Sequence, residues 1–115
     1  MSTEHQGRER RRGERVLIRV PVQLNGTAPD GSPINEAAEA VVVSRFGALL
    51  RTHTPLQKDS ALDVTNGFSN EVEKFRVVWV SDRAKEGRWD VGVEALNPRV
   101  DFWGIRFPAT ASPPA

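Results

Sequence analysis

The sequence contains no cysteine, and its two histidines, His5 and His53, lie far apart. Without thiols neither a disulfide framework nor a thiolate metal site can form, and the isolated histidines predict no metal site either. The carboxylates are scattered singly, no histidine or lysine stands at a position that would activate Ser44, and no glycine-rich phosphate loop precedes a helix. We therefore predict a binding protein that is not an enzyme, with no catalytic residue, no metal and no resident cofactor.

Long hydrophobic runs are also missing. No run reaches the roughly 18 apolar residues that predict a membrane span. Residues 1–13 are polar and charged, without the apolar centre of a signal peptide. Together with the lack of cysteine, these absences predict a cytoplasmic protein without a membrane partner.

Charges of the two signs are nearly equal in number, with 16 Lys and Arg against 15 Asp and Glu. Their distribution is uneven, because six arginines fall within residues 8–19 and only Glu9 and Glu14 oppose them. A short basic segment suits a compact anionic partner, such as a phosphate group, an acidic protein surface or nucleic acid. Residues 1–12 have no apolar periodicity, so we predict that they form a flexible basic arm.

The remaining sequence is typical of β-strands around a single core, as expected for 115 residues. Residues 16–24 alternate between apolar and polar, and residues 25–33 contain Asn-Gly, Asp-Gly and two prolines, which predict a turn and a hairpin. No convincing amphipathic helix precedes residue 97. The pattern predicts an all-β fold, an antiparallel barrel or sandwich, with six strands at residues 16–24, 36–43, 48–52, 62–65, 71–81 and 89–96.

Aromatic residues are few, and we expect the tryptophans and phenylalanines to pack in the core and at the barrel opening rather than to stack on bases. Phe75, Val77 and Trp79 recur at every second position, which places them on one face of their strand. This face is predicted to point inward.

The last part of the chain follows Asn97-Pro98. Here we expect a short C-terminal helical turn and then an extended piece, which place four apolar side chains against an opening of the barrel: Phe102, Trp103, Ile105 and Phe107. Residues 109–115 are small and proline-rich, which predicts a disordered tail. The folded domain is therefore expected to span residues 13–108.

Two short motifs resemble those of a known family. Arg11 and Arg15 form an Arg-x-x-x-Arg motif, and residues 42–47 read Val-Val-Ser-Arg-Phe-Gly. Together they resemble the PilZ domain, a small β-barrel that binds the bacterial second messenger cyclic di-GMP through Arg-x-x-x-Arg and Asp/Asn-x-Ser-x-x-Gly motifs. Val42 stands where that family has Asp or Asn. The stretches Arg-Val-Leu-Ile-Arg-Val-Pro-Val, Phe-Arg-Val-Val-Trp-Val and Asp-Val-Gly-Val-Glu-Ala, and the ending Asn-Pro-Arg-Val-Asp-Phe-Trp-Gly-Ile-Arg-Phe-Pro, match in order and spacing, the last as in a single-domain subgroup.

The resemblance implies a six-stranded antiparallel barrel and a set of ligand-binding residues. Guanidinium groups bind phosphate oxygens bidentately, pair with guanine and stack on bases. The residues that the resemblance implies for cyclic di-GMP are Arg11, Arg15, Ser44 and Gly47, with Arg10 and Arg12 as further candidates for phosphate contacts. A glycine permits an approach that a Cβ would block, and the hydroxyl of Ser44 can reach a phosphate or a base edge.

Three functions remain open at this point. The leading hypothesis is a cyclic di-GMP receptor whose arm becomes ordered on binding and changes the surface offered to an effector protein. The alternative is a degenerate PilZ domain that binds no nucleotide and acts as a protein-interaction module, which Val42 favours and the arginine arm disfavours. A small nucleic-acid binder ranks last, because it needs exposed aromatic side chains for base stacking and those of this chain are expected to be buried.

Overall fold

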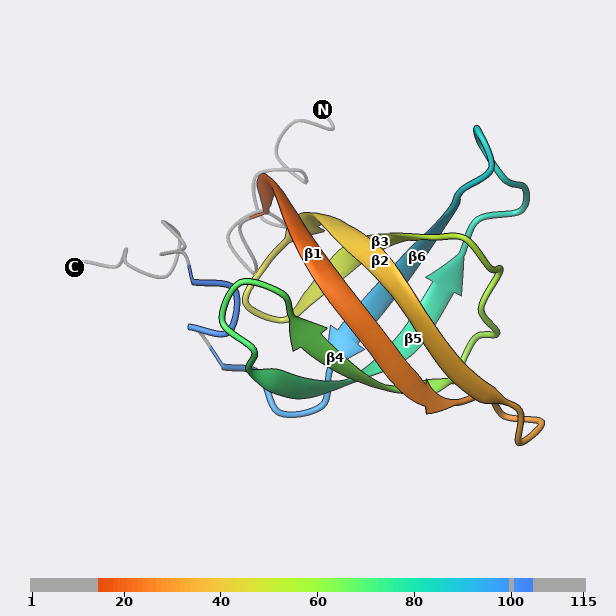
Figure 1. Ribbon diagram of the computed structural model, residues 1–115, viewed down its shortest axis with the longest axis horizontal. Helices are drawn as coiled ribbons and strands as arrows, with labels where there is room; N and C mark the ends of the chain where they lie inside the picture. Colours follow the sequence, from red (N-terminus) through yellow and green to blue (C-terminus); the bar gives the residue numbers. More distant parts are fainter. Residues whose placement is uncertain (1–14, 100, 105–115) are drawn as a thin grey trace, which may run out of the picture.

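The computed structural model describes residues 15–99 and 101–104. Six strands close into a barrel in the order β1-β2-β3-β6-β5-β4 (Figure 1), and each neighbouring pair is antiparallel. The strands are β1 (Val16–Thr27), β2 (Pro33–Val43), β3 (Gly47–Thr52), β4 (Ala61–Asn66), β5 (Val72–Val80) and β6 (Trp89–Ala95). No helix occurs in these described residues, and the predicted all-β antiparallel barrel is confirmed. The predicted arm, residues 1–12, and tail, residues 109–115, lie outside them.

The first hairpin is longer than the sequence indicated. The predicted turn began at Asn25, but β1 continues to Thr27 and the loop occupies only residues 28–32. Gly26 explains the difference, because a Cβ on it would lie 1.9 Å from the carbonyl oxygen of Ala61 in β4. This glycine therefore permits the close approach of two strands and makes no turn.

The loop at residues 28–32 is held by its own polar groups. The amide of Gly31, whose φ is 90°, donates to the carbonyl of Ala28 at 2.8 Å. The hydroxyl and amide of Ser32, and the side chain of Gln57, donate to the carboxylate of Asp30 and lower the pKa of Asp30 to about 2. These bonds explain why the hairpin reverses here.

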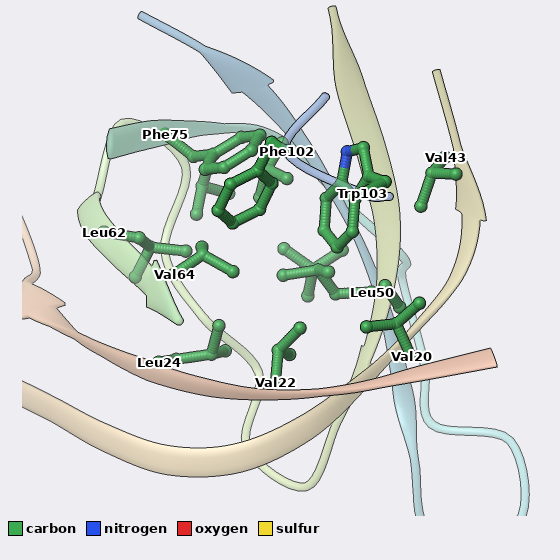
Figure 2. Packing of buried hydrophobic residues seen from close by; sticks show 14 of the residues in the cluster. Val20, Val22, Leu24, Val43, Leu50, Leu62, Val64, Phe75, Phe102 and Trp103 are labelled. Atoms are coloured by element: carbon green, nitrogen blue, oxygen red, sulfur yellow. The ribbon is translucent and has the colours of Figure 1, made fainter. Parts of the chain in front are cut away.

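The core fills the inside of the barrel with side chains from all six strands (Figure 2). Alternation along β1 buries Val20, Val22 and Leu24, as the sequence predicted. Buried residues of the other strands join them: Ala40, Val43, Leu50, Leu62, Val64, Phe75, Val77, Val91 and Val93. The inside of the barrel is thus a packed apolar core.

Two aromatic side chains from the segment after β6 complete this core. Phe102 and Trp103 are 2% and 5% exposed, and their rings lie 5.8 and 6.1 Å from the ring of Phe75. The side-chain amide of Asn66 donates to the carbonyl of Phe102 at 2.9 Å. Both residues therefore lie against the barrel interior, as expected. Residues 101–104 form a hydrogen-bonded turn, whereas residue 100, Ile105 and Phe107 lie outside the described residues.

An arginine ties the same segment to β5. Arg99 forms ion pairs with Glu71, with Glu73 at 3.3 Å and with Asp101 at 3.7 Å. Desolvation acts to lower the pKa of Arg99, but the hydrogen bond and charge of Glu71 and the charges of Glu73 and Asp101 outweigh it and raise the pKa. The side chain of Glu73 is only 6% exposed, so its buried charge depends on this guanidinium for compensation.

Three register shifts interrupt the pairing of the strands, and the one in β5 overturns a prediction. Val77 pairs with Val93, but the next pair is Trp79 with Gly92, so Val78 is an extra residue in β5. An extra residue reverses the alternation beyond it. The prediction that Trp79 shares the inward face of Phe75 and Val77 is therefore wrong: its side chain lies outside and is 51% exposed.

The general expectation for the aromatic residues is also only partly right. Phe75, Phe102 and Trp103 belong to the core, whereas Phe46 and Phe68, like Trp79, are exposed. Both phenylalanines lie in the connections between strands, where no inward face exists to receive them. The barrel therefore has exposed aromatic rings that periodicity did not predict.

Candidate functional site

An apolar row crosses the outer face of the barrel. The strand register aligns Leu17 with Val42, Val42 with Leu49, Leu49 with Gly92, and Gly92 with Trp79. Leu17 is 83% exposed and Val42 and Leu49 are half-buried. We call these five residues the apolar row. It spans β1, β2, β3, β6 and β5, and bulges before Val42 and Trp79 bring both into it.

A surface pocket of about 490 Å³ lies along this row. Its lining includes Arg15, Val42, Ser44, Gly47, Leu49 and Glu94. The structure thus brings together three predicted binding residues and the divergent Val42, which come from the start of β1, the end of β2 and the turn into β3. Arg10, Arg11 and Arg12, also predicted, lie outside the described residues.

Ser44 has a local role that its motif did not reveal. Its hydroxyl oxygen accepts from the amides of Phe46 and Gly47 at 3.2 and 3.1 Å, and its own amide donates to the carbonyl of Gly47 at 2.9 Å. These bonds fix the tight turn between β2 and β3. Ser44 lines the pocket, but its hydroxyl already serves the turn, accepting from two amides and donating to the carbonyl of Gly47 at 3.4 Å.

Gly47 is required by strand packing. A Cβ on it would lie 2.2 Å from the carbonyl oxygen of Val93 in β6, a distance that no real contact allows. The close approach expected at Gly47 was that of a ligand, whereas the neighbour that approaches in the structure is the backbone of β6. Gly47 therefore lets β3 and β6 come together beside the pocket that it lines.

A charged row, formed by Arg19, Glu39, Arg51 and Asp90, flanks the apolar row on the same outer face. Arg19 pairs with Glu39 at 3.5 Å, and Arg51 pairs with Asp90 at 3.3 Å. The positive charges of this row are thus matched by neighbouring carboxylates. Arg15, which lines the pocket and is exposed, has no ion pair with any described residue, so its guanidinium can meet an anionic ligand.

Comparison with known proteins relates this barrel to a solved structure. No family model and no curated protein matches the sequence. The PilZ domain with c-di-GMP of YcgR from Escherichia coli is similar in structure, with a TM-score of 0.55 and 18% sequence identity over 76% of this chain and 79% of that chain. The chain has the PilZ fold.

Other kinds of site find no support in the described part of this PilZ-like barrel. Residues 15–99 and 101–104 contain no group of three His, Cys, Asp or Glu side chains that could hold a metal ion. Nor does any helix within them have the length and apolar character of a membrane span. The pocket at the apolar row is the candidate site because three of the predicted binding residues line it.

Sequence reasoning missed three residues of this region. Trp79 was assigned to the core, Leu49 was read only as a strand residue, and Glu94 was not considered. Glu94 lies opposite Gly47 in β6 and forms an ion pair with Arg76 at 3.4 Å. No linear signal links Glu94 to the arginine motif, because the pairing of β3 with β6 joins segments far apart in the sequence.

Proposed function

We propose that this PilZ-like barrel binds cyclic di-GMP at the pocket on the apolar row and acts as a receptor rather than as an enzyme. The observation that carries the proposal is the convergence of Arg15, Ser44 and Gly47 on one pocket. The solved structure with a similar fold is a PilZ domain with c-di-GMP, which supports the same ligand class. The pocket of about 490 Å³ lies within the usual range of about 300–1,000 Å³ for small-molecule sites.

The chemistry of the pocket matches the two parts of the ligand. Arg15 offers a planar fork of donors to a phosphate or to the O6 and N7 atoms of guanine. Val42 and Leu49 provide an apolar surface for the flat face of a base. Charge-assisted hydrogen bonds contribute about 1.5 to 3 kcal/mol each, so two bidentate arginines account for much of a micromolar affinity of about 8 kcal/mol.

The response to the ligand is proposed to involve the arm. Arg11, with Arg10 and Arg12, lies three to five residues before Arg15 in the sequence, so these guanidinium groups can close over a ligand held in the pocket. Ordering of this segment would change the surface available to an effector protein, and a receptor for such a messenger would act in the cytoplasm. The output is therefore an interaction, with no reaction catalysed.

Isothermal titration of the purified protein with cyclic di-GMP tests the proposal. We expect saturable binding with a Kd of about micromolar order. The same titration in increasing salt should show weaker binding, because guanidinium–phosphate contacts are partly screened. An absence of binding at high micromolar ligand would contradict the proposal.

A second candidate function has its own supporting observation. Two side chains of the apolar row, Leu17 and Trp79, are exposed to solvent, and exposed apolar patches often mark protein-interaction sites. Val42, which lacks the acceptor found in the family motif, belongs to the same row. A barrel that binds no cyclic di-GMP in the titration would therefore be assigned to protein interaction.

The variant Val42→Asp should bind cyclic di-GMP more tightly by about 1 to 3 kcal/mol. Val42 is half-buried on the outer face and lines the pocket, so an aspartate there can accept from a guanine edge or orient an arginine. Its carboxylate reaches solvent, and thus thermal stability should change little. Nucleotide affinity and melting temperature measured on the same protein check both points.

Leu17→Asp provides the matched control. Leu17 pairs with Val42 in the same row, so this change adds the same charge beside the pocket without restoring the motif. We expect unchanged or weaker binding, because the added charge only repels phosphate. Equal gains in the two variants, or a Val42→Asp protein that is destabilised without a gain in affinity, would show that position 42 does not face the ligand.

A further inference from the structure

Glu94 is a carboxylate at the edge of a pocket that, on the proposed function, receives an anion. It lines the same pocket as Arg15, and its side chain is 58% exposed. A carboxylate beside a doubly charged ligand is unfavourable unless it meets hydrogen-bond donors. The position of Glu94 therefore calls for a donor group on the ligand.

The surroundings of Glu94 leave it able to accept such donors. Gly47 lies opposite it in β3, and a Cβ on Gly47 would come within 3.4 Å of the Cα of Glu94, so no side chain of that residue separates the carboxylate from the pocket. Its ion pair joins Nη2 of Arg76 to Oε1 at 3.4 Å, with both side chains about half exposed. An exposed pair of this length is weak and can be exchanged for a better one.

We propose that Glu94 determines base specificity by accepting hydrogen bonds from the N1–H and N2–H₂ donors of one guanine; this inference rests on the proposed function. Guanine presents two adjacent donors on its Watson–Crick edge, and a carboxylate accepts both in a bidentate pair. Adenine has an acceptor at N1 on the same edge. The lone pair of this N1 would face the carboxylate with no donor between them. Glu94 thus supplies, from β6, the base-edge acceptor that Val42 lacks on β2.

The phosphate and ribose parts of the ligand do not account for Glu94. Phosphate oxygens are acceptors only and carry negative charge, so they repel the carboxylate. The ribose hydroxyl is a donor, but it is the same in guanine and adenine dinucleotides. Selectivity between the two bases therefore isolates the proposed contact from any contact with the sugar.

The test compares cyclic di-GMP with cyclic di-AMP by isothermal titration. The parent protein should prefer the guanine ligand, and Glu94→Ala should reduce the ratio of the two Kd values by about 5- to 150-fold, the discrimination expected of one bidentate base contact. Glu94→Gln replaces one acceptor with an amide donor that can pair with N1 of adenine, so it too should reduce the ratio. A role confined to strand stability would change melting temperature and leave this ratio unaltered.

Two matched variants act as controls. Arg76→Ala removes the same ion pair but keeps the carboxylate, so it should preserve the preference for guanine. Asp63→Ala removes an exposed carboxylate of β4 that pairs with Lys74 at 3.1 Å and does not line the pocket, and it produces the same change in net charge as Glu94→Ala. It should leave the Kd ratio at the parent value.

The outcomes separate this inference from the proposed function. Binding of neither dinucleotide by the parent would overturn both. If the parent binds cyclic di-GMP tightly but Glu94→Ala leaves the Kd ratio unchanged, only the role of Glu94 is overturned. The same holds if the parent binds cyclic di-GMP tightly but has no preference for it over cyclic di-AMP. Equally tighter binding of both ligands by Glu94→Ala would likewise show that the carboxylate merely repels phosphate.

Discussion

Replacement of Trp103 by alanine is expected to lower the free energy of unfolding by about 3 to 5 kcal/mol, the usual cost of truncating a buried large aromatic side chain. Trp103 is 5% exposed, and its ring meets that of Phe102 edge-on, with the centroids 4.8 Å apart. Alanine would leave a cavity in the core and remove the contacts with the rings of Phe75 and Phe102 (Figure 2). Urea unfolding followed by circular dichroism measures the loss.

The comparison with Trp79→Ala makes this result specific. Trp79 is the same residue type but lies on the outer face and is 51% exposed, so its truncation should cost much less. If Trp103→Ala does not fold at all, Trp103→Phe should fold with a smaller loss, because it keeps most of the packing. Equal and small effects at both tryptophans would show that the segment after β6 does not pack in the barrel in solution.

Replacement of Arg15 by alanine should weaken cyclic di-GMP binding by about 2 to 5 kcal/mol, since truncation leaves a phosphate or guanine acceptor without its charged donor. Arg15 is exposed and pairs with no described carboxylate, so the free energy of unfolding should hardly change. Arg11→Ala is expected to act in the same direction with a smaller effect. Isothermal titration and urea unfolding of each variant check both quantities.

Arg19→Ala is the control for charge alone. Arg19 lies on the same strand, pairs with Glu39 at 3.5 Å and does not line the pocket. Its loss changes the net charge by the same amount as the loss of Arg15, so a general electrostatic attraction would be weakened equally in the two variants. Parent-like affinity of both Arg15→Ala and Arg11→Ala would place the ligand elsewhere.

The part of the fold that alternation encodes could be predicted from the sequence. Val20, Val22 and Leu24 recur at every second position, and such a pattern buries one face of a strand wherever the strand lies. The existence of six strands, the first hairpin and the burial of Phe102 and Trp103 follow from patterns of this local kind. Local patterns fail at Gly26, because the close approach of β4 that requires this glycine involves a distant segment.

The candidate site shows the same division. The residue types of Arg15, Ser44 and Gly47 and their spacing predicted a binding motif, and the structure brings these residues to one pocket. Neither Glu94 nor Trp79 could be assigned to that surface beforehand. The position of Glu94 depends on the register between β3 and β6, and that of Trp79 depends on a bulge at Val78.

The sequence by itself therefore determined the class of the fold, the number of strands and the local chemistry of the two motifs, because these properties depend on neighbours along the chain. Only the tertiary structure decided which strands pair beyond the first hairpin, that the apolar row crosses five strands, and that Glu94 of β6 lines the pocket. The physical reason is that a single extra residue in a strand reverses the faces beyond it. Whether such a bulge forms is decided by packing against partner strands that are distant in the sequence.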